Sequence, residues 1–175
     1  MKPTFDLAMR LLLRHEGGFV FLASDPGGMT NLGVTKGMWE KYVDREVDEK
    51  EMRELTPAKV TPFYKTRYWD AIHGDDLPAG VDYCVFDTCV NSGPGRATKI
   101  LQDALGVTID GVLGPATLSA VAKHHTAPLI SAYTTARLDF LKKLPRWDTF
   151  GKGWKKRVEE VEQEAKQFAG TEAGA

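Results

Sequence analysis

Hydrophobic positions along most of the chain repeat with the spacing of an α-helix. In residues 5–15, charged side chains recur every four positions on an otherwise apolar stretch, which Gly17-Gly18 ends. Residues 81–90 are apolar on nearly every side, so we expect them to form the buried central helix. The same reasoning predicts helices over residues 36–44, 57–69 with a break at Pro62, 94–105, 115–124, 128–144 and 154–168.

Residues 18–35 lack this helical period. The apolar run Phe19-Val20-Phe21-Leu22 is followed by the turn residues Asp25-Pro26-Gly27-Gly28 and then by Asn31-Leu32-Gly33-Val34. Pro followed by Gly at the centre of a turn suits a type II β-turn, so the segment predicts a small, irregular β-hairpin. The predicted fold class is therefore α+β, mostly α-helical, with one small β-hairpin and a helical C-terminal subdomain.

Composition indicates an ordinary globular protein. Hydrophobic residues make up 42% of the chain and charged residues 27%, so it can bury a core without a disulfide or a metal. Cys84 and Cys89 point to different sides of the predicted central helix, which disfavours a disulfide between them. The four histidines lack metal-ligand spacing, and no glycine-rich loop suits a phosphate. We therefore expect a monomer with no metal, no cofactor and no nucleic-acid partner.

The N-terminus differs from a secretion signal, because charged residues interrupt it and its longest uncharged apolar run is three residues. No segment approaches the roughly 20 apolar residues of a membrane-spanning helix. We expect synthesis in the cytoplasm without a signal peptide, so that a target outside the inner membrane would require another export route.

Charge is distributed unevenly. Residues 1–90 carry a net charge of −4 and residues 91–175 a net charge of +3. Residues 137–157 alone hold eight basic and two acidic side chains. A basic face of this kind favours an anionic polymer or a membrane surface, although a solvated helix face has the same pattern.

Glu16 is the first candidate for chemistry. It lies at the predicted end of a helix, where the partial negative charge of the helix terminus disfavours ionisation of a nearby carboxyl. Neighbouring apolar residues and the two glycines that follow suit a protonated acid beside a bulky polymer, as glycoside hydrolysis requires. A surface glutamate at a helix end is the alternative interpretation.

Asp25, nine residues later, lies at the hairpin turn, in a polar setting that suits a charged carboxylate. A protonated and an ionised carboxyl together are the pair that glycosidases use. Asp before Pro-Gly is also a favoured turn residue. Thr30 and Thr35 follow, and either hydroxyl could hold a water between the carboxyls, although Thr35 also suits a helix N-cap.

Several motifs in residues 4–93 together resemble glycoside hydrolase family 108, whose members are N-acetylmuramidases of phage lysis cassettes and of some bacterial secretion systems. These motifs are His15-Glu16-Gly17-Gly18-Phe19, Asp25-Pro26-Gly27-Gly28, Thr30-Asn31, Gly33-Val34-Thr35, Tyr68-Trp69, Val81-Asp82-Tyr83, Phe86-Asp87 and Val90-Asn91-Ser92-Gly93. The resemblance implies a lysozyme-like fold and makes Glu16 the catalytic acid. Phage lysozymes offer a looser resemblance: Glu16 and Asp25 fit their Glu-to-Asp spacing, but Thr30 follows one residue too early.

Residues 101–121 are similar to small helical peptidoglycan-binding modules, in which an Asp-Gly…Gly-Pro turn joins two helices. Here Asp110-Gly111 and Gly114-Pro115 supply that turn, which is also explained by structure alone. We therefore divide the chain into a muramidase region, residues 1–93, and a helical peptidoglycan-binding-like region, residues 94–175, packed on it as one compact unit.

Polar residues also mark one stripe of the predicted central helix. Tyr83, Asp87 and Asn91 follow one another at intervals of four, which suggests the wall of a sugar-binding groove. Buried hydrogen bonds within the core would give the same pattern. Trp69 is a further candidate for sugar stacking, with core packing as its alternative.

Together these features predict a peptidoglycan hydrolase of the endolysin type. It would cleave the β-1,4 bond between N-acetylmuramic acid and N-acetylglucosamine in glycan strands of the cell wall, reached through a holin or a secretion system. Three alternatives stay open: a lytic transglycosylase acting on the same bond, a non-catalytic cell-wall-binding protein, and a muramidase dedicated to toxin or effector export.

Overall fold

The computed structural model describes residues 3–24 and 28–172. Contacts group the chain into two compact units, one of residues 6–67 and one of residues 68–175 with the first five residues. This division differs from the predicted boundary after residue 93, because the helix of residues 81–92 packs on the helices that follow it.

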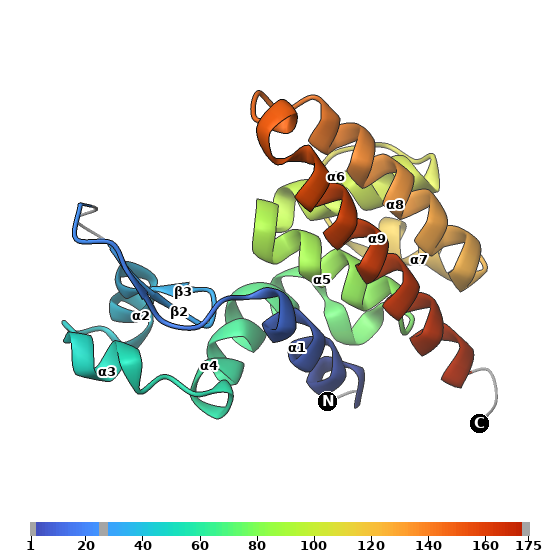
Figure 1. Cartoon of the computed structure of the whole chain (residues 1–175). Helices are drawn as coiled ribbons and strands as arrows, with labels where there is room; N and C mark the ends of the chain where they lie inside the picture. The colour runs from blue at the N-terminus through green and yellow to red at the C-terminus, as the bar shows by residue number, and fades with distance from the viewer. Residues whose placement is uncertain (1–2, 25–27, 173–175) are drawn as a thin grey trace. The chain divides into compact units, whose positions relative to one another are not determined.

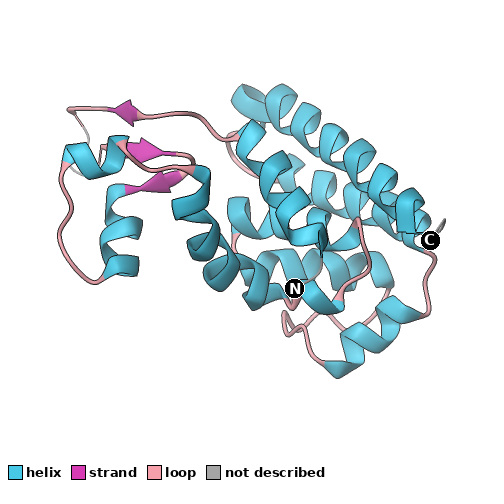
Figure 2. Cartoon of the chain, turned by 90° about the horizontal axis from the view of Figure 1, so that it is seen from below, coloured by secondary structure: helices cyan, strands magenta, loops and turns pink. Residues whose placement is uncertain are grey.

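The unit of residues 6–67 combines short strands with helices (Figure 1). Its elements are α1 (Pro3–His15, which begins in the other unit), β1 (Val20–Phe21), β2 (Met29–Asn31), β3 (Val34–Thr35), α2 (Lys36–Val43), α3 (Glu49–Arg53) and α4 (Pro57–Tyr64). The strands form one antiparallel sheet in the order β1-β2-β3, drawn as short arrows in Figure 2.

The sheet has one strand more than the predicted hairpin. Asn31 pairs with Val34, so only Leu32 and Gly33 connect β2 to β3. Both residues have positive φ, 51° for Leu32 and 76° for Gly33, as a two-residue type I′ turn requires. Glycine adopts this backbone readily, whereas leucine rarely does, so Leu32-Gly33 is a weak signal for a turn of this type.

Hydrogen bonds from side chains hold the elements of this unit together. The Thr35 hydroxyl accepts a hydrogen bond from the backbone N–H of Met38, which confirms the predicted N-cap of α2. The buried Asn31 amide donates to the carbonyl of Met52 at 2.9 Å and thereby joins β2 to α3. Trp39 is also buried, and its indole N–H donates to Glu51.

The unit of residues 68–175 is helical (Figures 1 and 2). A π-helical turn, η1 (Lys65–Trp69), leads into it. Its further elements are the 3₁₀ turns η2 (Asp70–Ile72) and η3 (Gly74–Asp76), then α5 (Val81–Ser92), α6 (Pro94–Leu105), α7 (Pro115–Ala122), α8 (Thr126–Lys142) and α9 (Trp147–Glu172). In α5 every residue from Val81 to Cys89 is buried, which confirms the predicted central helix.

Helix α5 packs against α6, α8 and α9, and α8 lies along α9. The bounds of α6 agree with the prediction, because Pro94 begins the helix and Gly106 ends it in a left-handed conformation. Within the described part of the chain, no helix is both long and apolar enough to span a membrane. The same residues include no cluster of His, Cys, Asp or Glu suited to a metal ion.

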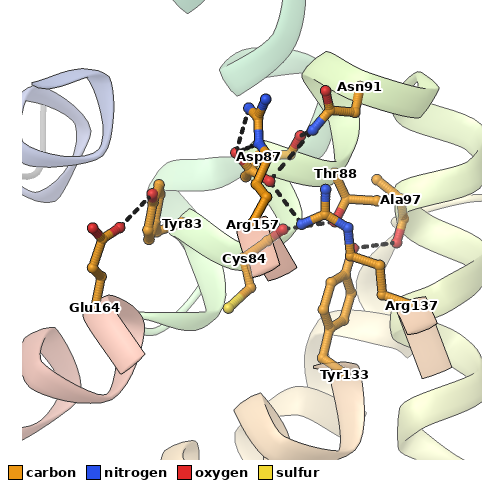
Figure 3. A network of polar contacts seen from close by, with 10 residues as sticks. All are labelled: Tyr83, Cys84, Asp87, Thr88, Asn91, Ala97, Tyr133, Arg137, Arg157 and Glu164. Atoms are coloured by element: carbon orange, nitrogen blue, oxygen red, sulfur yellow. Dashed lines mark hydrogen bonds and ion pairs between the residues drawn. The ribbon is translucent and has the colours of Figure 1, made fainter. Parts of the chain in front are cut away.

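A buried carboxylate links α5 to α8 and α9 (Figure 3). Asp87 is fully buried, and its two oxygens pair with Arg137 Nη1 at 2.7 Å and with Arg157 Nη2 at 2.8 Å. Burial opposes ionisation of Asp87, but the two arginines outweigh it and hold the pKa of this carboxyl below its usual range. At neutral pH Asp87 is therefore a charged anchor for three helices.

This anchor predicts loss of stability in acid. Because the pKa of Asp87 is lower in the folded chain, its contribution is complete above about pH 4 and is lost as the pH falls through the folded pKa. Asp87→Asn should lower the free energy of unfolding at pH 7 by about 3–5 kcal/mol, since it leaves buried arginines without their partner. It should also weaken the acid dependence in denaturant titrations. Asp139→Asn, at an exposed position of α8, is the control and should change stability by less than about 0.5 kcal/mol.

Candidate active site

Glu16 lies at the C-terminal end of α1, as the sequence predicts. Its backbone N–H donates to the carbonyl of Leu12 at 3.2 Å, so the residue continues the last helical turn. Its side chain is half-buried. Directly after it, the carbonyl of Gly17 accepts a hydrogen bond from the backbone N–H of Leu32 at 3.1 Å. This bond ties the end of α1 to the β2–β3 turn.

The carboxyl of Glu16 packs against that turn at Gly33, where any side chain would crowd it. A Cβ atom placed on Gly33 would lie 2.9 Å from Glu16 Cδ and Oε2 and 2.6 Å from the hydroxyl oxygen of Tyr64. These separations are shorter than van der Waals contact, so the missing side chain of Gly33 makes room for both groups. The positive φ of Gly33 independently favours glycine here.

Tyr64 completes the arrangement. It is buried at the end of α4, and its hydroxyl donates to the carbonyl of Leu32 at 2.7 Å. The Tyr64 phenol thus holds the β2–β3 turn and lies beside the Glu16 carboxyl. We refer to Glu16, Leu32, Gly33 and Tyr64 as the Glu16 site. All four belong to the unit of residues 6–67.

The backbone after Glu16 borders open space. A Cβ atom on Gly17 or Gly18 would meet no atom within 4 Å. Nearby, Val20, Phe21 and Leu22 are about half exposed in and after β1. The guanidinium of Arg53 lies 4.1 Å above the Phe19 ring, which holds the start of this segment against α3. The segment therefore presents apolar surface close in sequence to the acid.

Asp25 and Thr30 are the other two predicted catalytic residues. Asp25 lies outside the described residues. Thr30 is in β2, half-exposed, and pairs with Val20 on one side and Thr35 on the other. It belongs to the sheet whose β2–β3 turn contacts Glu16. Thr35, the other threonine that could hold a water, already caps α2 with its hydroxyl.

Three of the predicted sugar-binding residues are fully buried. Tyr83 and Asp87 have no exposed surface, and the Tyr83 hydroxyl donates to Glu164 at 2.8 Å (Figure 3). Trp69 is equally buried between Phe5 and Phe86, and its indole N–H donates to Asp75. This burial disagrees with direct contact to a glycan and favours the alternative, a set of satisfied core hydrogen bonds.

Asn91, at the end of α5, is exposed, and its amide donates to the backbone carbonyl oxygen of Asp87 at 3.0 Å. Of the polar stripe on α5, Asn91 thus bonds Asp87, and Asp87 pairs with Arg137 and Arg157. Sequence reasoning missed these two partners, which lie 50 and 70 positions away. The one available signal was the concentration of basic residues between them.

Comparison with known proteins agrees with this architecture. Residues 9–93 match the family model described as Glycosyl hydrolase 108, and residues 96–159 match one described as a Predicted Peptidoglycan domain. The solved structure of Brucella abortus SagA is similar over 97% of each chain, with 44% sequence identity and a TM-score of 0.84. No curated protein matches the chain. The chain belongs to the glycosyl hydrolase 108 family and is a glycoside hydrolase that acts on peptidoglycan.

Proposed function

We propose that the chain hydrolyses the β-1,4 bond between N-acetylmuramic acid and N-acetylglucosamine, with Glu16 as the general acid. The observation that supports this most is the placement of the Glu16 carboxyl, which packs on Gly33 beside the Tyr64 hydroxyl and next to open space. General acids must be held in position, because a displacement of about 1 Å can reduce the rate 100-fold.

In the proposed reaction, the Glu16 carboxyl donates its proton to the oxygen of the glycosidic bond. The C1–O bond breaks, positive charge develops on the muramic acid ring, and water adds at C1 and returns a proton to the site. Asp25 is proposed to stabilise the cationic ring or to activate the water. Thr30 is proposed to hold that water. No step requires a cofactor.

The surroundings of Glu16 support access by a polymer. Gly17 and Gly18 carry no side chain that could obstruct a sugar strand, and nothing lies within 4 Å of where one would start. The exposed side chains of Val20, Phe21 and Leu22 offer apolar surface, which suits the faces of sugar rings. A strand bound along β1 would thus pass the end of α1.

In its biological role, the protein is proposed to be an endolysin-type muramidase that clears the cell wall after holin-assisted release. Export of a secretion system's toxin or effector would use the same chemistry. A lytic transglycosylase is the nearest alternative in mechanism, since it needs only one acid. Mass spectrometry of the soluble products separates the two: hydrolysis gives reducing muramic acid ends, and the alternative gives 1,6-anhydro ends.

Replacing the acid by its amide tests the proposal. Glu16→Gln keeps the size of the side chain and removes the transferable proton, so clearing of purified peptidoglycan should slow by about 100-fold to 10,000-fold. Turbidity at matched protein concentration measures the effect. Glu46→Gln, a change at an exposed position between α2 and α3, should clear at the wild-type rate. Unchanged clearing by Glu16→Gln would exclude this residue as the acid.

The role of Gly33 gives a second test. Gly33→Ala introduces the Cβ that overlaps Glu16 and Tyr64 in a left-handed backbone, at a cost of about 1–3 kcal/mol of folding stability. Because the carboxyl must move, clearing should fall by about tenfold or more, even at temperatures where the variant is folded. Gly37→Ala is the matched control, since its Cβ meets nothing within 4 Å and α2 tolerates alanine. Full activity of folded Gly33→Ala would contradict a positional role for this glycine.

A further inference from the structure

The connection between α8 and α9 carries a basic surface that the proposed reaction does not use. Residues 142–156 include the end of α8, the turn after it and the first part of α9, and Figure 1 shows them at one end of this helix pair. Six of these residues are basic, and Asp148 is the one acidic residue among them. We call this surface the α8–α9 corner. Its basic residues are all exposed, and they are Lys142, Lys143, Arg146, Lys152, Lys155 and Lys156.

The charges of the α8–α9 corner differ from those farther along α9. There, Lys166 pairs with Glu162 at 2.8 Å, one turn away, as is common on a solvated helix face. In the corner, Lys155 and Lys156 each have a glutamate one turn ahead, at 3.7 and 3.9 Å. The other four basic residues have no ion-pair partner among the residues that the structure describes, and their charges are available to a ligand: Lys142, Lys143, Arg146 and Lys152.

Aromatic side chains lie among these charges. Phe150 is 46% exposed and stacks on Trp154 at a centroid distance of 5.9 Å. The Trp154 ring lies 6.3 Å from that of Trp147, and both tryptophans are half-exposed. A Cβ atom on Gly151 would lie 2.7 Å from the Trp147 ring, so this ring lies against the backbone of α9. The α8–α9 corner therefore combines positive charge with exposed aromatic surface.

We propose that the α8–α9 corner binds the surface of a membrane that contains anionic phospholipids. Clusters of about four to eight Lys or Arg residues on a helix surface attract anionic headgroups. Aromatic rings favour the boundary between headgroups and acyl chains, where their apolar faces leave water. A linear polyanion such as polyphosphate would match the charges but would leave the Phe150 ring in water. This contact is with lipid rather than with peptidoglycan, and it does not depend on the proposed reaction.

Vesicle flotation with the intact chain tests the proposal. Vesicles of phosphatidylglycerol and phosphatidylcholine in equal parts should carry the protein to the top of a density gradient, whereas pure phosphatidylcholine vesicles should leave it at the bottom. Salt at about 1 M should release the protein, because it screens charges beyond about 3 Å. Equal binding to both kinds of vesicle, or to neither, would overturn the proposal. Binding to polyphosphate without binding to the anionic vesicles would also overturn it.

Two triple variants with the same loss of charge then locate the contact. One neutralises the end of α8 and the turn after it, and it combines Lys142→Gln, Lys143→Gln and Arg146→Gln. Binding to the anionic vesicles should be about 100-fold weaker, since each basic residue near such a surface contributes about fivefold. The control removes three exposed charges elsewhere, through Lys41→Gln, Lys50→Gln and Lys123→Gln, and should bind as the wild type does. Equal weakening in both would contradict a contact at this corner, and melting temperatures show that both are folded.

Tryptophan fluorescence of the wild-type chain supplies a readout that needs no substitution. Of the four tryptophans, Trp39 and Trp69 are buried in the core, whereas Trp147 and Trp154 lie in the α8–α9 corner. Anionic lipids brominated in their acyl chains should therefore quench part of the emission when the protein binds. Unchanged emission from protein that floats with these vesicles would mean that another surface makes the contact, and would overturn the proposal.

A second matched pair tests the aromatic part of the contact. Phe150→Ser removes the exposed ring and should weaken binding to the anionic vesicles by about tenfold. Ile109→Ser removes a side chain that is 51% exposed between α6 and α7, and should bind as the wild type does. Wild-type binding by Phe150→Ser would contradict entry of this ring into the membrane interface.

Membrane binding and catalysis can fail separately. Flotation is measured without bond cleavage, and Glu16→Gln should float with anionic vesicles as the wild type does. A chain that clears peptidoglycan by means of Glu16 but stays at the bottom of the gradient would retain the proposed function and lose the membrane contact.

Discussion

The close approach of the Glu16 carboxyl to the backbone of Gly33 is the constraint on which the Glu16 site depends. It requires a residue without Cβ, with a φ of 76°, at the tip of a two-residue turn. Two hydrogen bonds hold this turn. The Tyr64 hydroxyl donates to the carbonyl of Leu32, and the backbone N–H of Leu32 donates to the carbonyl of Gly17. Helix α1, the sheet and α4 are thus joined at one point, and the acid side chain packs against the backbone there.

The two units use buried or half-buried carboxyls in opposite ways. In the unit of residues 68–175, Asp87 is enclosed and pairs with two arginines, and its negative charge fixes α5 to α8 and α9. In the unit of residues 6–67, Glu16 is half-exposed and borders open space. The family match ends at residue 93, whereas contacts divide the chain at residue 67, so α5 is part of the family's hydrolase region by sequence and part of the helical unit by packing.

Much of this architecture could be predicted from the sequence because the signals are local. Pro94 and Gly106 bound α6, Thr35 caps α2, and the apolar surface of residues 81–90 gives the central helix. The features that the sequence did not predict are contacts between residues far apart in the chain. Tyr64 meets the β2–β3 turn across 32 positions, and Asp87 meets its arginines across 50 and 70. In the sequence, a polar stripe on α5 has the same pattern whether its side chains line a groove or form buried ion pairs. Helix α9 begins at Trp147 rather than at residue 154, and a Cβ atom on Gly151 would lie 2.7 Å from the Trp147 ring.

The proposed catalysis depends on the position of one carboxyl relative to the bond that breaks. The most direct measurement is a crystal structure of the Glu16→Gln variant with a bound peptidoglycan glycan oligomer that carries no peptide. The account predicts that the side chain at position 16 lies within about 3 Å of a glycosidic oxygen linking a muramic acid residue to the next sugar. An oligomer that binds with each of its glycosidic oxygens well beyond hydrogen-bonding distance of position 16 would contradict it.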